Sequence, residues 1–112
     1  MDAAVALLAD DVVFRSPAVF KPYGGRETVA TILRAVFQVF EDFHYTDELA
    51  GDGIEALLFE ARVGTRSLQG VDLLRSDSDV RIAEFTVMIR SASGLIAVAE
   101  RMGPALDAAG VR

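Results

Sequence analysis

Hydrophobic and polar positions alternate with two different periods along this chain. In the first half, apolar residues recur at helical spacing on one face, at Val29, Ile32, Leu33, Val36, Phe37 and Phe40. From residue 43 onward the period is two, which predicts strands over 43–49, 54–63, 68–75 and 81–90. Gly51-Asp52-Gly53, Gly64-Thr65 and the Asp/Ser run 76–79 separate these strands and are typical of hairpin turns.

The two ends of the chain predict shorter elements. Residues 1–8 form a short apolar helical segment ended by Asp10-Asp11, and residues 12–16 form a strand stopped by Pro17. A Pro- and Gly-containing loop over 16–25 leads into the apolar helix, and Ser91 opens a final helix that Pro104 must kink or end. This order predicts one α+β domain over 1–112, with helices on one side of a curved antiparallel sheet.

Two of the predicted strands carry a carboxylate among apolar neighbours. Alternation groups Leu68, Gly70, Asp72 and Leu74 on one face of the first strand, and Ile82, Glu84, Thr86 and Met88 on one face of the second. If the strands pair through the 76–79 turn, Asp72 and Glu84 share a concave face, and their repulsion raises one pKa so that the pair can divide acid and base roles. The alternatives are an ion pair with Arg62, Arg75 or Arg90, or a place for Glu84 at the rim.

Composition and charge narrow the class of function. The 112 residues carry a formal charge of −6 with no basic cluster, which argues against a nucleic-acid partner. No apolar run reaches the length of a membrane span and no secretory signal is present, so a cytoplasmic location is expected. Without cysteine, and with His44 as the single histidine, we expect no metal site and no cofactor.

Three segments together resemble a known family. They are the run Leu8–Pro17, the stretch Gly24–Thr28 that opens the apolar helix, and Gly70-Val-Asp-Leu-Leu followed by Arg81-Ile-Ala-Glu-Phe. In order and spacing the chain resembles the SnoaL-like branch of the nuclear-transport-factor-2-like superfamily. The resemblance implies a cone in which a strongly bent sheet wraps over helices and encloses a pocket. The superfamily includes ketosteroid isomerase, polyketide cyclases, limonene epoxide hydrolase and binding-only domains.

The resemblance also implies which catalytic groups are present. Asp72 matches the protonated aspartate of ketosteroid isomerase, whereas the position of that enzyme's catalytic base is Ser16, followed by Pro17. The family's longer first helix, with its tyrosine, has no counterpart after Met1. Ketosteroid-isomerase activity is therefore not expected. The cone is expected to be open at one end, or closed by a partner subunit or by the segment after Pro104, unless the natural chain starts upstream.

These features predict a domain that binds a small, apolar, oxygenated molecule. The candidate ligand contacts are Phe14, Ser16, Tyr45, Phe59, Asp72, Glu84 and Met88, with Asp72 and Glu84 as the candidate catalytic pair. Core packing explains the aromatic residues equally well. One alternative is an isomerase, cyclase or epoxide hydrolase that uses Asp72 as acid or base, and another is a structural dimerisation module. Leu58, Val71 and Leu73 on the opposite sheet face predict a homodimer.

Overall fold

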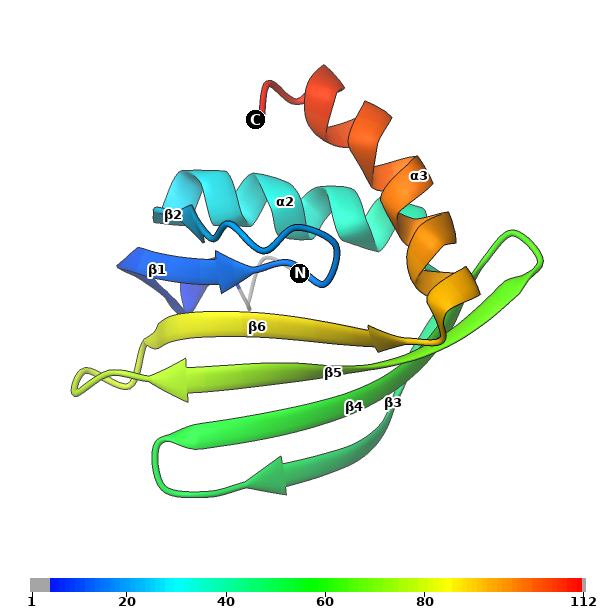
Figure 1. Ribbon diagram of the computed structural model, residues 1–112. Helices are drawn as coiled ribbons and strands as arrows, with labels where there is room; N and C mark the ends of the chain where they lie inside the picture. The colour runs from blue at the N-terminus through cyan, green and yellow to red at the C-terminus, as the bar shows by residue number, and fades with distance from the viewer. Residues whose placement is uncertain (1–4, 112) are drawn as a thin grey trace.

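The computed structural model describes residues 5–111, which form one curved sheet and two long helices (Figure 1). The strands are β1 (Leu8–Arg15), β2 (Tyr23–Gly24), β3 (Glu41–Ala50), β4 (Ile54–Val63), β5 (Arg66–Ser76) and β6 (Ile82–Arg90), and the helices are α2 (Arg26–Val39) and α3 (Ala92–Ala108). The four strands predicted between residues 43 and 90 are confirmed, each within a few residues of its expected ends.

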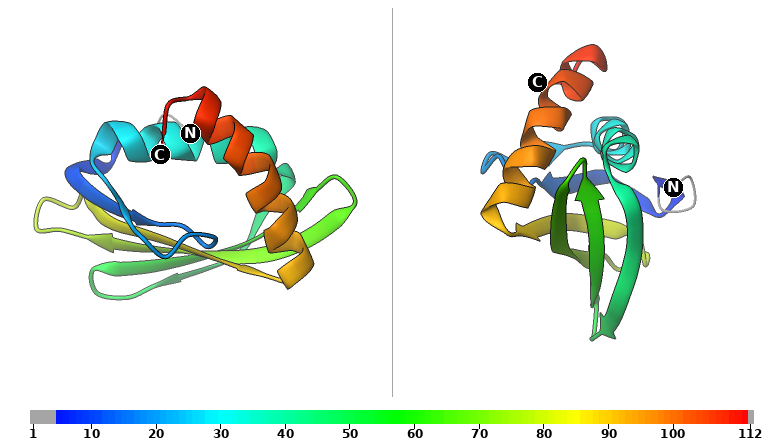
Figure 2. Two further views of the ribbon diagram at one scale, coloured as in Figure 1. Left: turned by 45° about the horizontal axis from the view of Figure 1, so that its top comes forward. Right: turned by 90° about the vertical axis from the view of Figure 1, so that its right-hand side faces the viewer.

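The sheet has the strand order β2-β1-β6-β5-β4-β3. Neighbours are antiparallel except for β1 and β6, which run parallel. Both helices lie over the same face of the sheet, and the longer strands curve beneath them (Figures 1 and 2). This arrangement confirms the predicted α+β architecture with a bent sheet.

Helix α2 is placed by its apolar stripe and by the residue that precedes it. Val29, Ile32 and Leu33 are buried against the sheet, as the helical spacing predicts. Gly25 precedes the helix with a φ of 97°, a conformation that glycine adopts without steric cost. The Gly25 N–H donates to the Val12 carbonyl at 2.9 Å, which ties the start of α2 to β1.

The predicted start of the first strand is wrong. Residues 1–4 lie outside the described part of the chain, but β1 begins at Leu8 rather than at residue 12. Leu8 is fully buried and pairs with Ile82, and an irregularity in the ladder before Val13 turns Asp10 and Asp11 outward. A strand can therefore include the two aspartates that were expected to end a helix.

Pro104 was expected to kink or end the last helix, and the second of these outcomes is excluded because α3 continues through Pro104 to Ala108. Proline removes one N–H from a helix and leaves the carbonyl four residues earlier without its partner. Here that residue is Glu100, which is exposed, as is Pro104 itself. Water can satisfy the free carbonyl, so the helix does not need to end.

The core fills the space between the helices and the concave face of the sheet. Its largest fully buried side chains are Phe59, Leu8, Val12 and Val29. Gly94 lets the first turn of α3 lie directly on β5, since a Cβ there would lie 2.8 Å from the Leu68 Cβ. Within residues 5–111, neither helix has the length and apolar character needed to cross a membrane.

Candidate ligand-binding site

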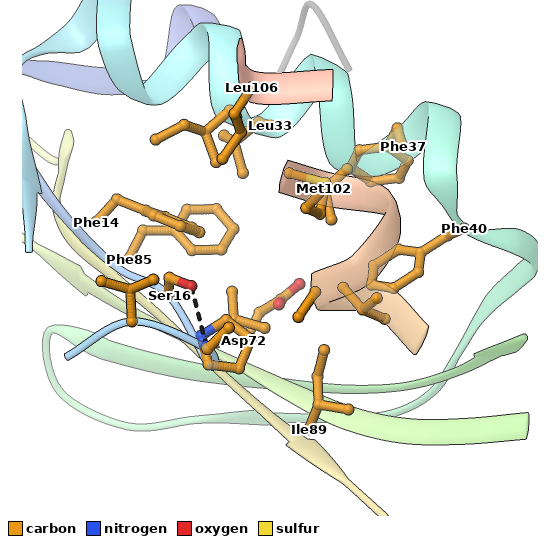
Figure 3. Close-up of a pocket in the computed structure, with 18 of the residues that line it drawn as sticks. Phe14, Ser16, Leu33, Phe37, Phe40, Asp72, Phe85, Ile89, Met102 and Leu106 are labelled. Atoms are coloured by element: carbon orange, nitrogen blue, oxygen red, sulfur yellow. Dashed lines mark hydrogen bonds between the residues drawn. The ribbon is translucent and has the colours of Figure 1, made fainter. Parts of the chain in front are cut away.

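A cavity of about 270 Å³ lies between the concave sheet face, α2, α3 and the loop after β1 (Figure 3). Its walls are almost entirely apolar. The residues that line it are Phe14, Ser16, Pro17, Ala18, Val19, Tyr23, Ile32, Leu33, Val36, Phe37, Phe40, Phe43, Asp72, Phe85, Val87, Ile89, Val98, Ala99, Met102 and Leu106. Among the described residues, Asp72 is the one charged residue in this lining, which makes it the chemical focus of the cavity.

Asp72 lies on β5, between β6 and β4 in the curved sheet. It pairs with Leu57 of β4 on one side and with Val87 of β6 on the other, and only 8% of its surface is exposed. Burial raises the pKa of its carboxyl to about 7, while the hydrogen-bonded Tyr45 hydroxyl acts weakly in the opposite direction. Near neutral pH, the protonated and ionised forms of Asp72 are therefore both accessible.

The structure excludes the alternative in which Asp72 is one half of an ion pair with arginine. Arg62 binds Glu41 and Asp42, Arg75 lies 3.9 Å from Glu84, and Arg90 donates to Gln69. Across residues 5–111, no salt bridge includes Asp72. A buried carboxyl without a counter-ion is costly to ionise, which agrees with its raised pKa.

Tyr45 reaches Asp72 from the edge strand β3. The pKa of its hydroxyl is raised to about 12, first by burial and then by the charge of Asp72 and the hydrogen bond to it. Its ring packs edge-on against Phe43, with 5.0 Å between centroids. Tyr45 is half-exposed and is absent from the cavity lining, so the structure makes it a partner of Asp72 rather than a wall residue.

Phe14 and Ser16, two of the candidate ligand contacts, line the cavity at the end of β1. The Ser16 Oγ accepts a hydrogen bond from the Ala18 N–H at 3.1 Å, which holds the turn that follows β1 (Figure 3). The hydroxyl remains able to donate a hydrogen bond toward the cavity. Ser16 therefore brings a neutral hydroxyl group to the position that resembles the catalytic base of ketosteroid isomerase.

The predicted placement of Glu84 and Met88 beside Asp72 is wrong. Arg75 pairs with Glu84 but Ser76 pairs with Ile82, so Ala83 is an extra residue in β6. This bulge reverses the alternation, and the residues that share a face with Asp72 are Phe85, Val87 and Ile89. Glu84 lies on the opposite face, 2.6 Å from Arg15, and Met88 is exposed there. Glu84 therefore cannot share acid–base chemistry with Asp72.

Phe59 lies behind the cavity wall rather than on it. Its ring contacts Phe40 and Phe43, which do line the cavity, with centroid distances of 5.6 and 5.0 Å. Gly70 provides the room for this ring, since any Cβ there would clash with it. Phe59 thus supports the wall through packing.

Helix α3 supplies wall residues that the sequence analysis did not assign to the site. Val98, Met102 and Leu106 are spaced by four residues, so they face the cavity in successive turns. This spacing in the sequence indicates one apolar face of the helix. Leu106 comes after Pro104, so the segment that was one of the options for closing the cone does contribute to the cavity.

The opposite sheet face carries the residues on which the homodimer prediction depends. Leu58 pairs with Val71, and Val71 pairs with Met88, so the three form a row on this face. The row is half-buried to exposed in the single chain. The homodimer stays a prediction.

His44 lies away from the cavity. Its Nδ1 donates to the Asp42 carbonyl at 3.0 Å, and its Nε2 lies 3.3 Å from a carboxylate oxygen of Glu60. Between residues 5 and 111, no cluster of three or more His, Asp or Glu side chains is arranged to hold a metal ion.

A bent sheet wrapped over helices around an internal cavity defines the nuclear-transport-factor-2-like class of α+β domains, also described as cystatin-like. Residues 1–99 match the SnoaL-like domain family, and the chain belongs to this family. No curated protein matches the sequence.

Several solved structures share this fold. A steroid delta-isomerase from Pseudomonas aeruginosa is 49% identical, with a TM-score of 0.91 over 96% of this chain and 80% of that chain. An uncharacterised protein with a cystatin-like fold from Silicibacter pomeroyi is 33% identical, with a TM-score of 0.91 over 95% of this chain and 75% of that one. An NTF2-like protein of unknown function from Mesorhizobium loti, 18% identical over 80% of this chain and 76% of that one, has a TM-score of 0.70 and shows the fold alone.

Proposed function

We propose that this domain binds a small apolar molecule in its cavity and fixes one polar atom of that molecule at Asp72. The observation that carries the proposal is the buried carboxyl of Asp72, the one charged group among the described residues of an almost entirely apolar lining. Ligand sites commonly combine apolar walls with a few polar groups, and the walls supply affinity while the polar groups set orientation.

The size of the cavity limits the ligand. Its volume of about 270 Å³ lies just below the range of about 300–1,000 Å³ that is usual for small-molecule sites. A compact ring system fits this space better than a long flexible chain. When Asp72 is protonated, its O–H can donate to a carbonyl oxygen of such a ligand, so a cyclic ketone matches both the walls and the polar group.

A second candidate function is an isomerase in which Asp72 moves the proton. The 49% identity to a protein described as a steroid delta-isomerase favours it, and a carboxyl with a pKa of about 7 suits proton transfer near neutrality. If Asp72 is the base, the activity requires its ionised form, so it should rise with pH through about 7 and disappear in Asp72→Asn.

The ligand-binding proposal predicts that 2-adamantanone, a compact cyclic ketone, binds at about pH 6, where Asp72 is mostly protonated. Isothermal titration calorimetry should show affinity that falls toward tenfold per pH unit above about 7, because the carboxylate cannot donate.

The matched control compares two substitutions in α3. Ala99 lines the cavity and Ala108 is exposed at the end of the same helix. Ala99→Phe fills the cavity and should weaken ketone binding at least tenfold, whereas Ala108→Phe should leave it unchanged. Equal binding by both variants, or no binding by the wild type at low pH, would refute the proposal.

A further inference from the structure

The proposed function concerns neutral ligands. The lining of the same cavity also suits a second class of ligand, and this inference rests on the proposed function. We propose that the cavity also accepts a compact hydrophobic amine in its protonated form, with ionised Asp72 as the counter-ion and phenylalanine rings around the ammonium group. The protonation state of Asp72 then determines which class of ligand binds. Protonated Asp72 binds a neutral hydrogen-bond acceptor, and ionised Asp72 binds a cation.

The first support is the lack of a protein counter-ion for Asp72. Neither α2 nor α3 presents a charged group to the cavity. Ser16 and Tyr23 bring the hydroxyl groups of the lining, and Tyr45 interacts with Asp72 from outside it. The adjacent strands contribute only apolar residues to the lining, such as Val87 and Ile89 on β6. Within the described residues, no arginine, lysine or histidine lines the cavity, so a positive charge must come from the ligand.

The second support is the aromatic lining. Five phenylalanines contribute to the walls: Phe14, Phe37, Phe40, Phe43 and Phe85. In Figure 3, Phe14 and Phe85 lie to one side of Asp72, and Phe37 and Phe40 lie to the other. Aromatic faces attract cations, most strongly where water is excluded. A cavity that joins one carboxylate to several rings therefore has the chemistry to recognise an ammonium ion.

The two ligand classes require opposite protonation states of Asp72. A ketone needs the O–H of Asp72, so its binding favours the protonated acid and raises the pKa of that group. An ammonium ion needs the carboxylate, so its binding lowers the pKa and releases a proton from molecules in which Asp72 was protonated. Tyr45, the other titratable group in contact with Asp72, has a pKa raised to about 12 and stays neutral throughout.

The experiment uses two probes of nearly the same shape, 2-adamantanone and 2-adamantylamine, titrated calorimetrically at about pH 6 and about pH 8 on either side of the Asp72 pKa. The ketone should bind more tightly at the lower pH and the amine at the higher pH. Repeating the amine titration at the lower pH in buffers with different ionisation heats should show release of close to one proton.

Asp72→Asn separates the two classes in a second way. The amide keeps a hydrogen-bond donor for the ketone but cannot neutralise a cation, so amine affinity should fall about 10- to 100-fold while ketone binding loses its pH dependence. Glu84→Gln removes an equal charge from the opposite sheet face and should change neither affinity. This control accounts for general attraction of the amine to a protein of formal charge −6.

The outcomes of these titrations distinguish failure of the ammonium inference from failure of the proposed function. Ketone binding without amine binding at the higher pH would overturn the ammonium inference and leave the proposed function intact. Amine binding that is equal in the wild type and in Asp72→Asn would also overturn the inference, and absence of binding by both probes would overturn both proposals. If Asp72→Asn does not fold, proton release by the wild-type protein still decides the inference.

Discussion

Replacement of Asp72 by asparagine is expected to stabilise the protein at about pH 8, by up to about 4 kcal/mol in the free energy of unfolding. The carboxyl has a pKa of about 7 in the folded chain and 3.8 as its reference value. Because the folded state holds the proton more tightly, ionisation costs the folded state stability. Asparagine fills nearly the same volume and removes that cost.

The stability difference between the wild type and Asp72→Asn should depend on pH. The folded pKa is raised, so the stability of the wild type relative to Asp72→Asn is lost as the pH rises from about 4 to about 7, by about 1.4 kcal/mol per unit. The gain from the substitution should therefore vanish near pH 4 and level off above about 7. Urea denaturation of both proteins across this range measures the difference directly.

A matched substitution tests whether burial is the cause. Glu84 is partly exposed and paired with Arg15, so Glu84→Gln should change stability by less than about 1 kcal/mol, and in the destabilising direction. A loss of stability in Asp72→Asn at the higher pH would mean that the carboxylate is compensated by an interaction, and that the cavity is not an apolar ligand site.

The wild-type protein is expected not to isomerise a β,γ-unsaturated steroid ketone at a useful rate. The position that resembles the isomerase's base is Ser16, whose Oγ accepts from the Ala18 N–H and has no base of its own. Loss of a general base costs a factor of about 10²–10⁴ in rate. Absorbance at the wavelength of the conjugated product measures the conversion.

Two variants make this expectation specific. Ser16→Asp places a carboxylate in the cavity lining and should give only weak activity. Ser16→Asn has a similar size without the charge and should remain inactive. Robust turnover by the wild type that is lost in Asp72→Asn would favour the isomerase candidate over simple ligand binding.

The inward position of Asp72 could be predicted because β5 is regular. Leu68, Gly70 and Asp72 are all buried, as strict alternation requires, and the ladder with β4 has no irregularity from Ile54 to Val63. The burial of Asp72 follows from this regularity alone. The same reasoning gave the apolar stripe of α2.

The face of β6 could not be predicted in the same way because of one inserted residue. Ile82 is buried and starts the strand, but the bulge at Ala83 places Phe85 on the buried face as well. The wholly apolar set Phe85, Val87 and Ile89 was the signal that pointed to the correct face. Bulges of this kind depend on pairing with a neighbouring strand, which periodicity within one strand does not record.

The contribution of α3 to the cavity depends on contacts between distant parts of the chain. Helical spacing marks Val98, Met102 and Leu106 as one face, but the direction in which α3 leaves β6 decides what that face meets. Gly94 in α3 contributes to that direction, because it allows the helix to approach β5 closely. A tertiary contact of this kind was beyond local pattern reasoning.

The central claim is that Asp72 is a buried carboxyl, without a counter-ion among the described residues, that a cavity ligand contacts. The most direct measurement is the titration of its side-chain carboxyl carbon by NMR, with and without 2-adamantanone. We expect a pKa of about 7 in the free protein and a higher pKa in the ketone complex, because the ketone binds the protonated acid. A pKa near the reference value of 3.8, unchanged by the ketone, would contradict the account.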